Sequence, residues 1–197
     1  MREYEEWSET GNTLADIGMY EEADECYDRA LELNPEYTCA WYNKGDILLE
    51  LEDYSNALFC FDKVLELDPT NDDAWVYRGA CYCELGMYEK GITCYNEALT
   101  INSCNPWVPL RKSWALFELG RYEEAISCID KGLKSDAIDS DLWTCKGMVL
   151  GGLRRYQEAI VCYDNALKLS PTHEWALEEK QKTMKKLNID SEGKAVG

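Results

Sequence analysis

The chain has 197 residues, of which 46% are hydrophobic and 12% aromatic, enough to build one ordinary domain or one stack of small repeats. Its 38 acidic and 20 basic residues give a net charge of −18, which repels phosphate and so disfavours nucleic acid and anionic membranes as partners. No run of about 18 apolar residues is present, and the acidic N-terminal segment has no apolar signal-peptide core, so we expect a cytoplasmic protein.

A period of 34 residues runs without insertion through residues 4–173. It predicts five tandem repeats, which span 4–37, 38–71, 72–105, 106–139 and 140–173. One place of the repeat always holds tyrosine, at Tyr20, Tyr54, Tyr88, Tyr122 and Tyr156. Another place nearly always holds glycine, with Gly11, Gly45, Gly79, Ser113 and Gly147 in register.

Each repeat is predicted to form two helices joined by a short turn. In residues 38–71, apolar residues from Trp41 onward follow helical spacing, a turn is expected near Tyr54, and a second apolar stripe follows it. Gly45 and Ala57 are small because the two helices touch at these places. A single hairpin of this kind cannot bury its apolar face, so the repeats must stack. The expected fold is therefore all-α.

The fourth repeat departs most from the pattern. It has Pro109, Ser113, Ile129, Gly132 and Ala137 where the other repeats favour Trp, Gly, an aromatic residue, Ala and Pro. Asn105 is expected to cap its first helix, with Pro106 at the first helical position. Two interpretations remain open, namely drift with compensating changes or a local adjustment of curvature for a partner.

Residues 174–188 are predicted to form a capping helix that covers the last repeat. We expect Leu177, Met184 and Leu187 on its packed face, and Lys180, Lys182, Lys185 and Lys186 on its solvated face. Residues 189–197 are expected to be a flexible tail.

These motifs resemble those of the tetratricopeptide repeat family. The fifth repeat carries the resemblance most fully, with Leu150 in place of an aromatic residue and with Trp143, Gly147, Ala159, Tyr163, Ala166 and Pro171. The resemblance covers roughly residues 4–173. It implies a right-handed superhelix, or solenoid, whose first helices line a concave groove, and it implies that the groove binds peptides or proteins.

The register of that family places the second, fifth, sixth, ninth and twelfth side chains of each repeat in the groove, and ten of these are the candidate binding residues. The N-terminal group is polar and acidic, and comprises Asn12, Tyr42, Asn43, Asp46, Asp73 and Tyr77. The later group is mainly aromatic, and comprises Trp107, Arg111, Trp114 and Phe117. Exposed aromatic clusters are candidate binding hot spots, although some of these rings could instead fold back onto neighbouring repeats.

Some members of the family hold a C-terminal carboxylate with a clamp of Lys, Arg and Asn side chains. Asn12 and Asn43 match the Asn places of that clamp. Ser8, Asp73 and Tyr77 stand at the places of its three cations, so we expect no carboxylate clamp.

Negative charge is concentrated early in the chain. The first repeat holds eleven acidic residues against one basic residue, whereas the fifth holds three acidic against four basic. This gradient favours a basic partner segment whose apolar part lies over the aromatic group. An alternative is that like charge prevents self-stacking at the N-terminal end.

No residue pattern indicates an enzyme, a metal site or a cofactor. Cysteine recurs on the second helices at Cys26, Cys60, Cys94, Cys128 and Cys162, and residues in such a ladder do not converge on one ion. Small packing residues are the preferred interpretation. The single histidine, His173, lies in a turn, and no phosphate loop or nucleophile motif is present.

The expected function is that of a protein-interaction scaffold or adaptor. The alternative is a structural repeat protein that self-associates through its terminal repeat or its groove. The protein is accordingly expected to be a monomer or a weak homo-oligomer.

Overall fold

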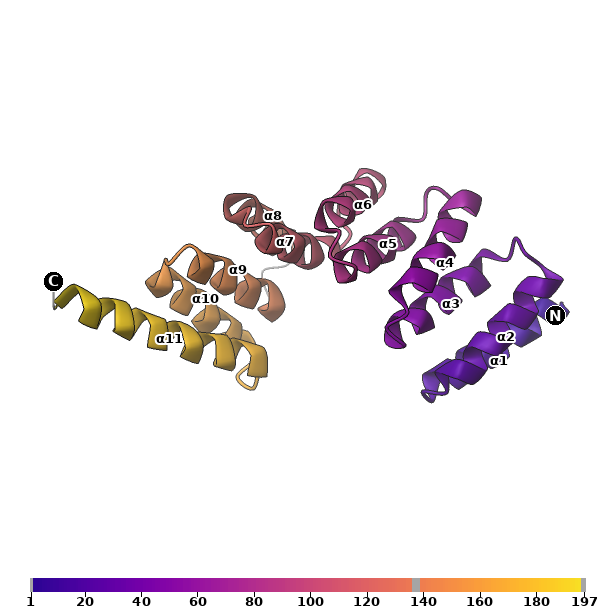
Figure 1. Ribbon diagram of the computed structural model, residues 1–197, viewed down its shortest axis with the longest axis horizontal. Coiled ribbons are helices and arrows are strands. Elements are labelled where there is room, and N and C mark those ends of the chain that lie inside the picture. Colours follow the sequence, from indigo (N-terminus) through magenta and orange to yellow (C-terminus); the bar gives the residue numbers. More distant parts are fainter. Residues whose placement is uncertain (1, 136–138, 196–197) are drawn as a thin grey trace. The chain divides into compact units, whose positions relative to one another are not determined.

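The computed structural model describes residues 2–135 and 139–195, and the described residues form eleven α-helices without a β-strand (Figure 1). They divide into an N-terminal unit, Met1–Asn105, and a C-terminal unit, Pro106–Gly197. The N-terminal unit contains α1 (Glu3–Asp16), α2 (Tyr20–Leu33), α3 (Thr38–Glu50), α4 (Tyr54–Leu67), α5 (Asp72–Glu84) and α6 (Tyr88–Ile101). The C-terminal unit contains α7 (Val108–Glu118), α8 (Tyr122–Ser135), α9 (Ser140–Gly152), α10 (Tyr156–Leu169) and α11 (Glu174–Ala195). The predicted all-α class is confirmed.

Consecutive helices pair as antiparallel hairpins, with α1, α3, α5, α7 and α9 as the first helices (Figure 1). Within each unit, the second helix of one hairpin also packs against the first helix of the next. This arrangement makes each hairpin complete the core of its neighbour.

An aromatic ring lies directly on a glycine in four of the five hairpins. The rings belong to Tyr27, Phe61, Tyr95 and Tyr163, each at most 1% exposed, and they cover Gly11, Gly45, Gly79 and Gly147. A Cβ atom added to Gly45 would lie 2.8 Å from Cζ of Phe61. Only a residue without a side chain permits this approach, so the predicted reason for the small residue at Gly45 is confirmed.

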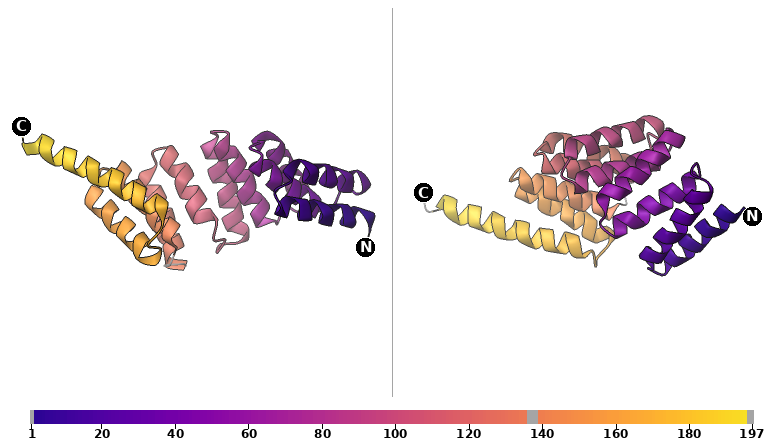
Figure 2. Two further views of the ribbon diagram at one scale, coloured as in Figure 1. Left: turned by 90° about the horizontal axis from the view of Figure 1, so that it is seen from below. Right: turned by 45° about the vertical axis from the view of Figure 1, so that its right-hand side comes forward.

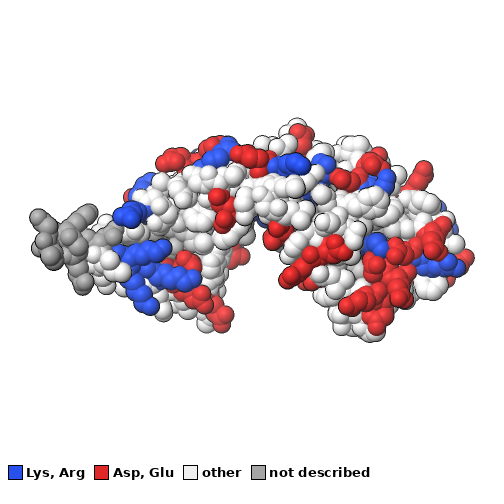
Figure 3. Space-filling view, viewed as in Figure 1, with Lys and Arg blue, Asp and Glu red and all other residues white. Residues whose placement is uncertain are grey.

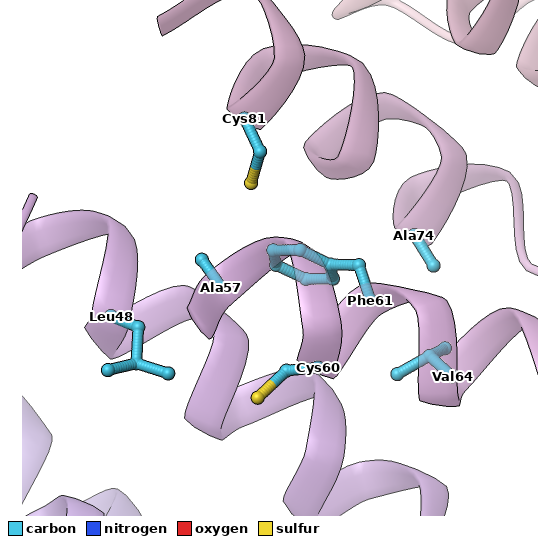
Figure 4. Packing of buried hydrophobic residues seen from close by; sticks show 7 residues of the cluster. All are labelled: Leu48, Ala57, Cys60, Phe61, Val64, Ala74 and Cys81. Carbon is cyan, nitrogen blue, oxygen red and sulfur yellow. The ribbon is translucent and has the colours of Figure 1, made fainter. Parts of the chain in front are cut away.

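Figure 4 shows the core that results around Phe61. Leu48 from α3, Cys60 and Val64 from α4, and Ala74 from α5 surround the ring, and all are at most 7% exposed. Three successive helices therefore contribute to one cluster, which couples the second repeat to the third.

Every first helix from α1 to α9 ends in the same backbone turn. The residue at this turn has positive φ in each repeat, at Gly18, Glu52, Gly86, Gly120 and Arg154. In the second repeat, N–H of Asp53 donates to C=O of Leu48 at 2.8 Å, and N–H of Glu52 donates to C=O of Leu49 at 3.0 Å. This pair of bonds satisfies helix-end carbonyls and reverses the chain.

Ion pairs join successive hairpins at one repeated place. Nζ of Lys44 lies 2.6 Å from Asp28, and Nζ of Lys146 lies 2.6 Å from Asp130. The same register gives Arg78 with Asp62 and Lys180 with Asp164, each also at 2.6 Å. These charges are partly exposed, so each pair contributes on the order of 1 kcal/mol or less.

The fourth repeat replaces the shared packing with its own. A Cβ atom on Gly132 would lie 2.7 Å from Cβ of Pro109, so this glycine accommodates the proline ring. Ile129 and Ser113 are fully buried, and Oγ of Ser113 donates to C=O of Leu110 at 2.8 Å. These paired changes favour drift with compensation. Ala137 lies outside the described residues.

The expected cap of the fourth repeat is wrong. Helix α7 begins at Val108 with Trp107 at its N-cap, so Pro106 is not the first helical residue. Nδ2 of Asn105 instead donates to Asp72 at 2.8 Å and to Asp73 at 3.3 Å. Two carboxylates therefore hold Asn105 within the N-terminal unit.

Helix α11 differs from the predicted capping helix in its length and in its packed face. It extends to Ala195, beyond Asn188, where the expected helix ends and the expected tail begins; residues 196 and 197 lie outside the described part. Leu177 is 39% exposed and Met184 is 46% exposed, so neither belongs to the packed face. Ala176 and Thr183 are buried instead, because these places lie against the preceding hairpin.

Two glycines of α9 provide a matched test of the close helix approach. A Cβ atom on Gly147 would lie 2.5 Å from Cε1 of Tyr163, whereas one on Gly151 would lie no closer than 3.8 Å to Oγ1 of Thr183. We expect Gly147→Ala to lower the free energy of unfolding by about 1–3 kcal/mol through overpacking. Gly151→Ala should raise it by up to about 1 kcal/mol through helix propensity. Urea unfolding measures both, and equal shifts in the two variants would contradict the packing argument.

Buried tyrosines predict a loss of stability in alkali. Burial, as the largest cause, raises the pKa of Tyr163 to about 12, above the unfolded value near 10. A raised folded-state pKa gives stability that is present below about pH 10 and is lost as the pH rises toward 12. Urea unfolding of Tyr163→Phe should therefore lose stability less steeply over this range than the parent, by at most about 1.4 kcal/mol per pH unit. Parallel curves would show that Tyr163 ionises normally.

Candidate functional site

The first helices of the N-terminal unit bring the predicted polar residues into contact. Nδ2 of Asn43 on α3 donates to Oδ1 of Asn12 on α1 at 2.8 Å. The same oxygen accepts from the hydroxyl of the buried Tyr27 at 2.8 Å. The two Asn side chains are thus fixed to each other and to the core beneath them.

Tyr42 and Tyr77 continue this row from α3 to α5. Their ring centroids are 5.7 Å apart and nearly perpendicular, and each ring also lies within 6 Å of the Phe61 ring centroid. Burial is the main cause that raises the pKa of Tyr42, followed by the proximity of Tyr77 and Asp73. Tyr42 therefore remains a neutral hydroxyl beside carboxylates, with Asp46 also close by.

The net negative charge of the chain resides in this unit. Met1–Asn105 contains 24 acidic and six basic residues, which equals a net charge of −18, whereas Pro106–Gly197 contains 14 of each and is neutral. Acidic side chains gather over the N-terminal helices in Figure 3. Asp46 and Asp73 are both exposed among them.

The C-terminal unit carries the predicted aromatic residues on α7 and at its N-cap. Trp107 is 61% exposed and Trp114 is 41% exposed, while Phe117 is half-buried. The centroid of Trp114 lies 5.9 Å from that of Phe117, so these two form one patch. Arg111 is half-buried on the same helix.

Two residues of this patch were not among the predicted site residues. The Tyr122 ring, at the start of α8, lies 5.6 Å from Phe117. A Cβ atom on Gly152 would lie 3.2 Å from Cε1 of Tyr122 and 3.3 Å from Cε2 of Phe117. Glycine at this place therefore lets both rings lie against the end of α9. The unusual Gly151-Gly152 pair was the available sequence signal.

Side chains at other positions of the same predicted groove register are buried. Five of these side chains are at most 6% exposed, namely Ser8, Val76, Ala80, Thr144 and Cys145. They pack between helices and are not available to a partner. The ten predicted site residues thus form two groups, six in the N-terminal unit and four in the C-terminal unit.

The cysteine ladder belongs to the core. Cys26, Cys60, Cys94 and Cys162 are at most 8% exposed, Cys128 is half-buried, and all five are free thiols. Burial raises the pKa of Cys94 to about 11, which opposes thiolate formation near neutral pH. The ladder consequently consists of small packing residues.

The described residues contain neither a metal-binding cluster nor a membrane-spanning helix. Among the described residues, no three His, Cys, Asp or Glu side chains are arranged to hold a metal ion. Nε2 of His173 lies 2.8 Å from Asp141, which ties the turn before α11 to the start of α9. In the described part of the chain, no helix combines the length and apolar character that a membrane span requires.

Sequence models of the tetratricopeptide repeat match most of the chain. One model matches residues 4–37, 38–71 and 140–173, and two further models of the same repeat match 60–93 and 110–139. No curated protein matches the chain significantly.

Solved structures of repeat proteins share the fold. YrrB, described as a TPR protein with an unusual peptide-binding site, is 23% identical with a TM-score of 0.71, and the match covers 89% of this chain and 90% of YrrB. A thermophilic TPR protein of Thermus thermophilus, TTC0263, is 18% identical with a TM-score of 0.74 and coverages of 92% and 98%. A tetratricopeptide repeat protein from Parabacteroides merdae is 20% identical with a TM-score of 0.83 and coverages of 98% and 76%.

The repeat matches extend over far more than half of the sequence, and the described helices form the corresponding hairpins. The chain belongs to the tetratricopeptide repeat family.

Proposed function

We propose that this protein is an interaction scaffold that binds a peptide or protein segment through exposed side chains of its first helices. The observation that carries the proposal is a contrast along the first helices. Some side chains of the groove register are buried, whereas others are exposed. Ser8 and Val76 are at most 2% exposed, whereas Asp46, Asp73 and Trp114 are exposed in the same register. The peptide-binding site of the similar protein YrrB supports this use of the fold.

The N-terminal unit suits a basic segment. Its net charge of −18 attracts Lys and Arg side chains and speeds their encounter with the surface. Asp46 and Asp73 lie near the half-buried Tyr42, so a cationic side chain would meet carboxylates beside an aromatic residue.

The C-terminal unit suits apolar anchors of the same partner. Trp107 and Trp114 expose large aromatic surfaces on a unit without net charge. Tryptophan is enriched among residues that dominate binding energy. We propose that hydrophobic side chains of the partner bind here.

An acidic C-terminal tail does not suit this surface. The cation places of a carboxylate clamp hold Ser8, Asp73 and Tyr77, and Ser8 is only 2% exposed. With no cation at any of these places, the carboxylate clamp is missing.

Binding, without catalysis, is the role we propose, in the cytoplasm and without a metal or cofactor. All ten cysteines are free thiols, which fits a reducing compartment. We expect no binding to nucleic acid or to anionic membranes, because the net charge is negative.

Peptide titration tests the proposal. A fluorescent peptide that combines Lys and Arg residues with Leu and Phe anchors should bind the full chain, and added salt should weaken binding. Trp114→Ala should weaken it by about 30-fold, the effect of losing a hot-spot residue. Asp46→Asn should weaken it by up to about fivefold, the effect of one exposed ion pair.

Val161→Ala is a matched control, because Val161 is 57% exposed on the second helix α10. It should leave the affinity unchanged. Affinity that is independent of salt and unchanged by Trp114→Ala would refute the proposal. Light scattering across a concentration series checks the self-associating alternative, since a monomer at tens of micromolar excludes it.

A further inference from the structure

The turns between first and second helices lie along one edge of the N-terminal unit. Its three hairpins stack in order, from indigo to magenta in Figure 2, and each second helix packs against the next first helix. The turns α1–α2, α3–α4 and α5–α6 consequently follow one another along the unit. Residues 16–22, 50–56 and 84–90, which contain these turns, are called the turn edge below.

Large apolar side chains are exposed in all three turns. Five of them are between 37% and 67% exposed, namely Ile17, Met19, Leu51, Leu85 and Met87. Methionine is frequent on surfaces that bind apolar partners, because its side chain is flexible and polarizable. The turn edge therefore offers apolar contacts to another molecule along its whole length.

The two methionines stand where a polar residue would serve the helix better. Met19 and Met87 are the N-cap residues of α2 and α6, and neither side chain makes a capping hydrogen bond. At the same place of α4, Asp53 accepts a hydrogen bond from N–H of Asn56 at 3.2 Å. A helix is less stable when its N-cap lacks such an acceptor. Exposed methionine at an N-cap thus contributes little to the fold, which favours a role in binding.

Negative charge surrounds these apolar side chains. The turn edge holds eight acidic residues and one basic residue, Lys90, whose ammonium lies 5.2 Å from the centroid of the Tyr82 ring. Burial is the largest cause that raises the pKa of the Tyr54 hydroxyl, followed by the charges of Glu52 and Glu84. Both carboxylates therefore lie near Tyr54, although they belong to successive hairpins. The acidic border thus continues from one hairpin to the next.

The corresponding turns of the C-terminal unit have a different character. Residues 118–124 and 152–158 hold four acidic and three basic residues. Arg121 and Arg155 stand at the places of the two methionines, and each pairs with a glutamate of its own second helix, at 2.7 Å and 2.6 Å. The hairpin fold therefore does not require an exposed methionine in an acidic setting.

We propose that the turn edge of the N-terminal unit binds a basic amphipathic helix of a partner protein. The apolar residues of the bound helix contact the five exposed side chains, and its Lys and Arg residues meet the surrounding carboxylates. Helices that pack together lie on the order of 10 Å apart, so three successive turns extend over on the order of 20 Å, the length of about 14 helical residues. The turn edge contains no residue of the groove register, so it is a second surface beside that of the proposed function.

A designed peptide serves as the probe. It has about 18 residues, blocked ends and a fluorophore, with Leu at every third or fourth place and Lys at the others, so that one helical face is apolar. A scrambled peptide has the same composition and charge but no apolar face. Fluorescence anisotropy with the full chain should show saturable binding of the amphipathic peptide, and binding of the scrambled peptide should be at least about tenfold weaker.

The double variant Met19→Ser, Met87→Ser separates a role in binding from a role in folding. It should weaken binding of the amphipathic peptide by about tenfold, because two apolar contacts are lost while the net charge stays the same. It should also raise the urea midpoint of unfolding, because Ser is a favourable N-cap residue. A loss of binding in a more stable protein cannot result from unfolding. Val161→Ser, on the second helix α10, is the matched control and should bind as the parent does.

A second double variant tests the charges. Glu52→Gln, Glu84→Gln should weaken binding by about three- to tenfold through the loss of two exposed ion pairs. The control Glu25→Gln, Glu97→Gln removes the same charge from exposed places on α2 and α6, outside the turn edge. It should weaken binding by about twofold or less, since only distant, screened attraction is lost.

The proposal is overturned if the amphipathic and scrambled peptides bind equally, or if the methionine double variant binds the amphipathic peptide as tightly as the parent. It is also overturned if light scattering finds a dimer that this variant dissociates, because a second copy then covers the turn edge. Trp114→Ala should leave the affinity of the amphipathic peptide unchanged, and the methionine variant should leave the affinity of the peptide that tests the proposed function unchanged. Failure of one proposal is therefore distinguishable from failure of the other.

Discussion

The contact between an aromatic ring on a second helix and a glycine on its first helix determines the geometry of the hairpins. Tyr27, Phe61, Tyr95 and Tyr163 lie on their glycines at distances that no side chain could share. Together with the positive-φ turn, this contact fixes how closely and at which register the two helices pack. The hairpin of the fourth repeat is held by different contacts, in which Pro109 packs against Gly132 and Ile129 is buried.

Because these inner places are fixed by packing, we expect a partner to be recognised at the exposed places. The N-terminal unit carries the whole net charge, and the C-terminal unit exposes Trp107 and Trp114 without net charge. The buried thiols of the cysteine ladder contribute only packing. A scaffold of this kind can change its partner by substitutions at exposed places without disturbing its hairpins.

The repeat period was sufficient to predict the helices and the reason for the small residues. The repeat period could not predict which side chains of the groove register are buried, because the burial of Ser8 or Thr144 depends on the neighbouring helix. The apolar character of Leu177 and Met184 predicted that they lie on the packed face of α11. Both side chains are exposed instead. The role of Gly152 depends on where the Tyr122 and Phe117 rings meet, which no linear spacing specifies. Asn105 is a typical helix cap in sequence, but α7 begins only at Val108, and the Asn105 side chain donates to two carboxylates instead.

Site-specific photo-crosslinking in the source cells most directly tests the claim that the first helices bind the partner. A photoreactive amino acid would replace Asp46 or Trp114 on first helices and, as matched controls, Phe59 or Val161 on second helices, which are 52% and 57% exposed. We expect both first-helix positions to give adducts with the same protein and the controls to give none. Adducts that form mainly at Phe59 and Val161 would contradict it.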